Sequence, residues 1–180
     1  MEIDKTYCLK EAEICLSPNC SERVSREISL LVIHGISLPP GKYGGGYIEK
    51  LFTNKLDPKE HPYFQEISNL KVSSHILIKR DGSIIQFVPF NMKAWHAGVS
   101  NYKGREDCNE FSIGIELEGT DETSYTDAQY DTLIKMTMEI MALYPGIKKD
   151  DIVGHSDIAP GRKTDPGESF DWNHYLSSLV

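Results

Sequence analysis

Two histidines and an aspartate occupy places in this sequence where they could bind one metal ion. His34 ends the apolar run SLLVIHG, and His155 ends the run DIVGH. Asp165 follows in VGHSDIAPGRKTDPG, whose prolines and glycines predict a loop. Two imidazoles and one carboxylate are the protein ligands of open tetrahedral zinc sites in hydrolases. The residue types therefore suggest hydrolysis at a zinc ion, although the spacing alone is a modest signal.

Other hydrolytic sites have less support, and the metal interpretation has structural alternatives. No G-x-S-x-G nucleophile elbow and no helical H-E-x-x-H motif occurs. The string HSD at residues 155–157 is too common to indicate a serine triad. A histidine beside an apolar run is often a hydrogen-bonded core residue, and Asp165 could simply brace its Asp-Pro turn.

A further carboxylate lies in the alternating stretch FSIGIELEG. Apolar residues at positions 113, 115 and 117 alternate with Gly114, Glu116 and Glu118, which predicts a strand that carries carboxylates on one face. Glu116 within this apolar strand is therefore a candidate functional residue, or else a solvent-facing one.

The elements that would position these residues alternate strands with helices. Strands are expected within residues 29–35, 111–119 and 151–155, and SSHILIKRDGSIIQFVP predicts a hairpin that turns at Asp81-Gly82. Residues 37–47 predict an irregular flap, and short helical turns follow it. Thr126 and Gln129 form a capping box for a long helix that stops at Pro145-Gly146. We predict an α/β (α+β) fold: a mixed central β-sheet flanked by helices.

Composition limits the kind of protein this can be. The chain has 180 residues, of which 39% are hydrophobic, so we expect a single domain over residues 1–180 with its core at about 17–178. A net charge of -8 argues against nucleic acid and favours a small-molecule substrate. The N-terminal residues resemble neither a signal peptide nor a membrane span, so a cytoplasmic location is expected. We also expect the protein to be a monomer. The four cysteines match no zinc-ribbon spacing and are expected to be free thiols.

Longer motifs resemble a known family. In chain order they are LLVIHGISLPPG, VSSHILIKRDGSIIQFVPF, AWHAGVS, CNEFSIGIELEGTD, YTDAQY and GHSDIAPGRKTDPG. Together they closely resemble the N-acetylmuramoyl-L-alanine amidase type 2 family, in particular its cytoplasmic members that act on 1,6-anhydro-muropeptides.

The resemblance implies a fold, a cofactor and roles for five residues. It implies Zn²⁺ bound by His34, His155 and Asp165, with Glu116 and Lys163 as the catalytic pair. Glu116 would pass a proton from water to the departing amine, and Lys163 would stabilise the tetrahedral oxyanion. The bond implied joins the lactyl group of 1,6-anhydro-N-acetylmuramic acid to L-alanine of the stem peptide, in peptidoglycan recycling. Removal of such muropeptides would also restrain muropeptide-triggered β-lactamase induction where the regulator exists.

Several positions stay open within this resemblance. His75 and His96 could support either the core or the site. The family pattern has arginine where this chain has Lys71 and Asp107, which puts the stem-peptide preference in doubt. It has asparagine where this chain has Gly35. The same fold also serves non-catalytic muropeptide-binding modules and amidases of the intact cell wall, which are the alternative functions.

Overall fold

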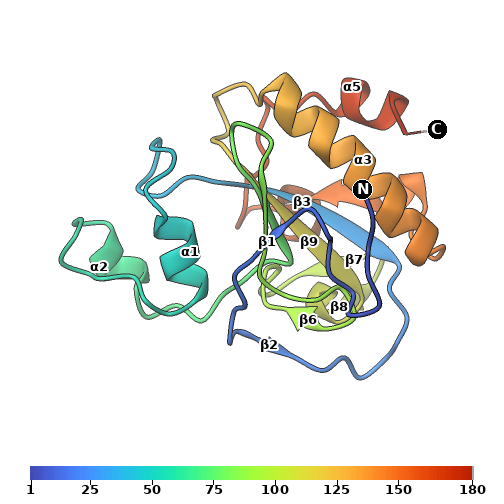
Figure 1. The fold of residues 1–180 in the computed structure, drawn as a ribbon, viewed down its shortest axis with the longest axis horizontal. Coiled ribbons are helices and arrows are strands. Elements are labelled where there is room, and N and C mark those ends of the chain that lie inside the picture. Colours follow the sequence, from blue (N-terminus) through green and yellow to red (C-terminus); the bar gives the residue numbers. More distant parts are fainter. Residues whose placement is uncertain (180) are drawn as a thin grey trace.

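The computed structural model describes residues 1–179 and contains a six-stranded central sheet (Figure 1). The strands are β1 Glu13–Ile14, β2 Cys20–Ser21, β3 Leu30–Ile36, β4 Ile76–Ile78, β5 Ile84–Gln86, β6 Lys93–Ala94, β7 Asn101–Tyr102, β8 Arg105–Glu106, β9 Ser112–Glu118 and β10 Ile152–Gly154. The α-helices are α1 Tyr47–Phe52, α2 Phe64–Ile67, α3 Asp127–Leu143, α4 His155–Ile158 and α5 Trp172–Ser177. Two 3₁₀ turns are η1 Cys108–Glu110 and η2 Lys149–Asp151.

The central sheet is mixed, as the sequence predicted. Its strand order is β1-β5-β4-β9-β3-β10. Strands β4, β9, β3 and β10 are parallel to one another, β1 is parallel to β5, and β4 and β5 form the antiparallel hairpin. Gly82 has a φ of 82° at the turn of this hairpin, which a residue without a Cβ adopts readily. Three adjacent parallel strands, β9, β3 and β10, therefore end together at one edge of the sheet.

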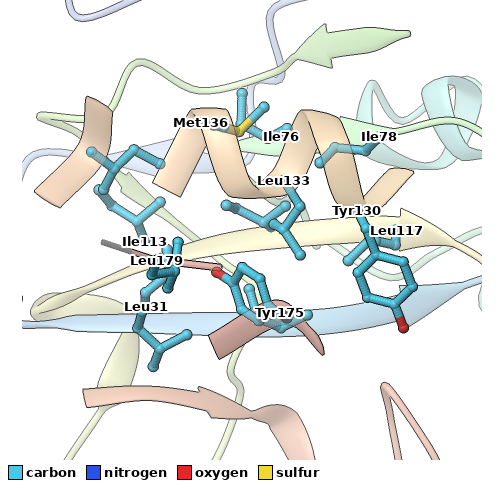
Figure 2. Packing of buried hydrophobic residues seen from close by; sticks show 14 of the residues in the cluster. Leu31, Ile76, Ile78, Ile113, Leu117, Tyr130, Leu133, Met136, Tyr175 and Leu179 are labelled. Carbon is cyan, nitrogen blue, oxygen red and sulfur yellow. The ribbon is translucent and has the colours of Figure 1, made fainter. Parts of the chain in front are cut away.

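Helix α3 covers one face of the sheet and begins at the predicted capping box. The Gln129 backbone N–H donates to Thr126 Oγ1 at 3.2 Å, and the Thr126 N–H donates to Gln129 Oε1 at 3.0 Å. Figure 2 shows Leu133 and Met136 of α3 packed toward the sheet. Their neighbours include Leu31, Ile76, Ile78, Ile113, Leu117, Tyr175 and Leu179. This apolar layer fixes the odd-numbered positions of β3 and β9 toward α3.

The opposite face of the sheet is covered by shorter elements. Helices α1 and α2, which Figure 1 shows set apart from α3 and α5, pack with the hairpin strands in a second apolar cluster. Leu30 and Val32 of β3 pack in a third cluster with Phe111 and Ile158. All seven residues of β9 are buried. Glu116 consequently does not face solvent, and that alternative from the alternating pattern is wrong.

Residues before position 17 also pack on this body. Strand β1 pairs with β5, and Leu9 is buried in the cluster beneath α3. The four cysteines are free thiols, as expected. Among the helices of residues 1–179, none is long and apolar enough to cross a membrane.

Candidate active site

Strand register brings three of the candidate residues into one row. His34 on β3 is the direct partner of Glu116 on β9. Gly154 of β10 is paired with Ile33, so the next residue, His155, lies beside His34. Neighbouring residues in paired parallel strands point to the same face. The three side chains therefore lie side by side on the face opposite α3: Glu116 on β9, His34 on β3, and His155 directly after β10.

The loop after α4 adds the third potential ligand. Asp157 accepts a hydrogen bond from the Gly154 N–H at 2.7 Å, which caps the first turn of α4 directly after His155. The Ser156 N–H donates to the Asp165 carbonyl at 3.0 Å and thereby holds the loop against this turn. The loop thus returns the Asp165 carboxylate to the end of β10.

The three potential ligands converge on one point. His34 Nδ1 and His155 Nδ1 are 2.9 Å apart, and each lies 3.1 Å from Asp165 Oδ2. The Nε2 atom of His155 lies 3.2 Å from the Ala97 carbonyl, and that of His34 lies 2.9 Å from His96 Nδ1. Each Nε2 lies within hydrogen-bonding distance of a possible acceptor, and the tautomer with hydrogen on Nε2 leaves both Nδ1 lone pairs directed at Asp165.

This donor set fits a zinc ion. Two bare nitrogen lone pairs and a carboxylate oxygen at such short separations repel one another unless a cation lies among them. Ligands about 2.0–2.1 Å from a tetrahedral zinc ion are about 3.3–3.4 Å apart, close to the separations here. His34, His155 and Asp165 could therefore hold a metal ion and leave one position open for water or substrate.

The protonation states of these groups favour metal binding. Burial lowers the pKa of His34 to about 4, against the opposing effect of the Asp165 carboxylate, which would accept a hydrogen bond from an imidazolium at this position. Burial would raise the pKa of Asp165, but the adjacent rings of His155 and His34, which favour an ionised carboxylate, outweigh this and hold the pKa well below the ordinary value. At neutral pH the site therefore has a neutral imidazole at His34 and an ionised carboxylate at Asp165.

Glu116 and Lys163 line the same cleft, which has a volume of about 580 Å³. The Glu116 side chain is buried, and its Oε2 has no hydrogen-bond partner within residues 1–179. Burial first, and then the negative charge of Asp165, raise the pKa of Glu116 well above its ordinary value, whereas Lys163 lowers it. A buried carboxyl group with a free oxygen and a raised pKa is suited to accept and return a proton.

The structure gives different positions to the two histidines left open by the sequence. His96 lies against His34, as described above, and its Nε2 lies 3.1 Å from Ser112 Oγ. His75 is fully buried and accepts a hydrogen bond from the Gly114 N–H at 3.0 Å through Nδ1. His75 is therefore a core residue, and His96 belongs to the site.

Two contributors to the site were missed in the sequence. Asn109 Oδ1 accepts hydrogen bonds from the backbone N–H groups of His96 and Ala97, at 3.0 and 2.8 Å. No sequence pattern indicates that Asn109 holds the backbone of residues 96 and 97. Ser112 could have been found, because the alternation that places Glu116 on one face of its strand also places Ser112 there.

The three positions that the sequence resemblance left open, Gly35, Lys71 and Asp107, differ in their relation to the cleft. Gly35 lines it, and a Cβ at this position would meet the Tyr125 hydroxyl. Lys71 is exposed, and its neighbours Leu70 and Val72 line the cleft. Asp107 lines a different cavity and lies 3.8 Å from Lys93, as a loose ion pair on the surface.

Comparison with known proteins identifies the family. Residues 24–168 match the family model described as N-acetylmuramoyl-L-alanine amidase. The chain belongs to this family. It is 60% identical over 164 residues to the 1,6-anhydro-N-acetylmuramyl-L-alanine amidase AmpD of Haemophilus influenzae, a match that covers 91% of this chain and 89% of that protein. It is also 60% identical over 147 residues to AmpD of Escherichia coli, covering 82% and 80% of the two chains.

Solved structures of the amidase family share the fold. A crystal structure of AmpD superposes with a TM-score of 0.97 at 53% identity, over 100% of both chains. The amidase AmiD of Escherichia coli, solved with anhydro-N-acetylmuramic acid-L-Ala-D-γ-Glu-L-Lys, has a TM-score of 0.63 at 31% identity and is matched over 58% of its length. The predicted mixed α/β fold and the resemblance to this family are both confirmed.

Proposed function

We propose that this member of the amidase family is a zinc-dependent enzyme that hydrolyses the amide between 1,6-anhydro-N-acetylmuramic acid and L-alanine of the stem peptide. The convergence of two bare imidazole nitrogens and a carboxylate beside a buried, unpaired glutamate carries the proposal. The activity named for the relatives of about 60% identity supports the choice of bond. We further propose that the whole chain forms one domain and acts as a monomer in cytoplasmic peptidoglycan recycling, which would also limit muropeptide-triggered β-lactamase induction.

In this proposal His34, His155 and Asp165 hold the ion. When bound there, zinc supplies Lewis acidity, which makes water nucleophilic near neutral pH and polarises the scissile carbonyl. Glu116 takes the proton from the attacking water at its free carboxylate oxygen and delivers it to the departing nitrogen.

Lys163 completes the machinery from the loop between the second and third ligands. It is exposed at the cleft, and its ammonium has no ion pair within residues 1–179. That group would donate a hydrogen bond to the oxygen that becomes negative when the carbonyl is attacked. Lys163 is two residues from Asp165 on this loop, so its position is tied to the metal site.

The test is mass spectrometry of zinc-loaded protein incubated with anhydro-muramyl tripeptide and, separately, with non-anhydro muramyl tripeptide. Each substrate is tested with and without chelator, beside the Asp165→Ala variant. We expect chelator-sensitive release of free peptide from the anhydro substrate and none from the variant. Absence of release from both substrates would indicate a binding module, and equal release from both would indicate a broader cell-wall amidase.

A further inference from the structure

We infer that His96 is a positioning residue: as a neutral imidazole it accepts a hydrogen bond from His34 and so holds His34 in its metal-binding orientation. The inference rests on the proposed metal site and adds a residue that does not itself bind the metal. The contact that carries it is the 2.9 Å separation between His34 Nε2 and His96 Nδ1. Both side chains are buried, so water does not compete for this contact.

The direction of this hydrogen bond follows from counting protons. His34 Nδ1 must be bare to bind a cation, so its hydrogen is on Nε2 and His34 is the donor. His96 Nδ1 is then the acceptor, and the hydrogen of His96 lies on Nε2, opposite Ser112 Oγ at 3.1 Å. A protonated His96 would instead turn a second N–H toward the N–H of His34. The arrangement therefore requires a neutral ring at position 96.

The surrounding chain is built to hold this ring in place. The His96 and Ala97 backbone N–H groups both donate to Asn109 Oδ1, which fixes the segment against η1. A Cβ at Gly114 would lie only 2.5–2.7 Å from ring atoms of His96, so the absence of a side chain there makes room for the imidazole. One face of β9 therefore contributes three residues to the site: Ser112 contacts the His96 ring, Gly114 leaves room for it, and Glu116 lines the cleft.

A neutral acceptor has a chemical consequence. Metal-binding histidines commonly donate their second N–H to a carboxylate, which orients the ring and also increases its basicity. An imidazole at position 96 gives the orientation without adding another negative charge near Glu116. With Asp165 as the only charged ligand, the site would leave a bound zinc ion a net positive charge, which would favour loss of a proton from water to Glu116.

A pair of substitutions separates the two ends of the ring. In His96→Asn the amide occupies the place of Nδ1 and can still accept from His34, whereas in His96→Gln it reaches the place of Nε2 and Ser112. Zinc affinity is measured by competition with a chromophoric chelator, and melting temperature is recorded for each variant. We expect His96→Gln to bind zinc about 10–100-fold more weakly and His96→Asn to remain within about threefold of the unmodified chain.

Controls separate positioning from folding and from the proposed function itself. Thr137→Val removes the buried hydrogen bond to Tyr175, at 2.6 Å, within the α3 layer, and should lower the melting temperature without changing zinc affinity. Equal zinc affinity in the Asn and Gln variants would overturn the inference. If the unmodified chain bound no zinc, the proposed function would fail as well.

A second measurement does not depend on any variant folding. Two-bond ¹H–¹⁵N correlation spectra of the zinc-loaded protein report the tautomer of each histidine. We expect His34 and His96 both to carry hydrogen on Nε2. A hydrogen on Nδ1 of His96, or an imidazolium there, would contradict the proposed hydrogen bond.

Discussion

At the scale of single residues, Glu116 has an environment unfavourable to its own charge. Its carboxyl group is buried, one oxygen lacks a hydrogen-bond partner within residues 1–179, and its pKa is raised by burial and by Asp165. An acid whose pKa is higher in the folded chain than its ordinary value of 4.5 stabilises the fold only while protonated. That contribution is lost as the pH rises above 4.5 toward the folded-state pKa.

The raised pKa of Glu116 gives a stability prediction for the metal-free protein. Glu116→Gln keeps the shape of the side chain and removes its charge, so we expect the free energy of unfolding to rise by about 1–3 kcal/mol at neutral pH. The difference should disappear below pH 4.5, where the unmodified glutamate is protonated as well. Urea denaturation of both proteins across this pH range measures it. A variant less stable than the unmodified chain at neutral pH would show that the buried charge of Glu116 does not lower the free energy of unfolding.

The same residue, with Lys163, carries an activity prediction. Glu116→Gln and Lys163→Met should each lower kcat by about 10²–10⁴-fold, because one removes proton transfer and the other removes oxyanion stabilisation. Bound zinc, measured by elemental analysis, should stay unchanged in both. The exposed Lys59 lies outside the cleft, and Lys59→Met is the matched control that should retain activity. Full activity in either catalytic variant would remove that residue from the mechanism.

At the scale of elements, the capping box of α3 is a local feature with a measurable effect. Thr126 Oγ1 accepts from the Gln129 N–H and also donates to the Arg80 carbonyl at 2.8 Å. Thr126→Ala removes both contacts, so we expect a loss of about 1–2 kcal/mol in the free energy of unfolding. The exposed Thr123, whose hydroxyl makes no hydrogen bond within residues 1–179, provides the control variant Thr123→Ala. Equal stability of the two variants would mean that the cap does not support α3.

Elements with local signals were predictable from the sequence, and those that depend on distant partners were not. The start of α3 and the Asp81-Gly82 hairpin follow from residues a few positions apart, and both are confirmed. Strands β1, β2 and β6 have two residues each, which is too short for a period to be read. They exist because distant segments pair with them, and the same is true of the strand order.

The same division applies to the site. His34, Glu116 and His155 could be placed at strand ends from their apolar neighbours, but their alignment across β9, β3 and β10 depends on a register that no local pattern encodes. The solvent-facing alternative for Glu116 arose because alternation distinguishes two faces of a strand and does not say whether both are covered. His96 could not be assigned for a similar reason, since its partner is distant in sequence.

At the scale of the whole molecule, the proposed ion would join the sheet to the loop that follows β10. A ligand that binds only the folded state stabilises it, by about 2.7 kcal/mol when free zinc is 100 times the dissociation constant. For a chain of this length we expect chelation to lower the melting temperature by about 5–10 °C. Calorimetry of metal-loaded and chelated protein measures the shift, and Asp165→Ala should abolish it. An unchanged melting temperature would argue against a metal that bridges these segments.

The separation of the proposed metal ligands along the chain has a further consequence, for synthesis. His34 and His155 are 121 positions apart, and they meet only through the pairing of β10 with β3. A nascent chain that has not yet released β10 from the ribosome presents His34 without either of its co-ligands. In the proposed site, metal loading would therefore follow the completion of the sheet.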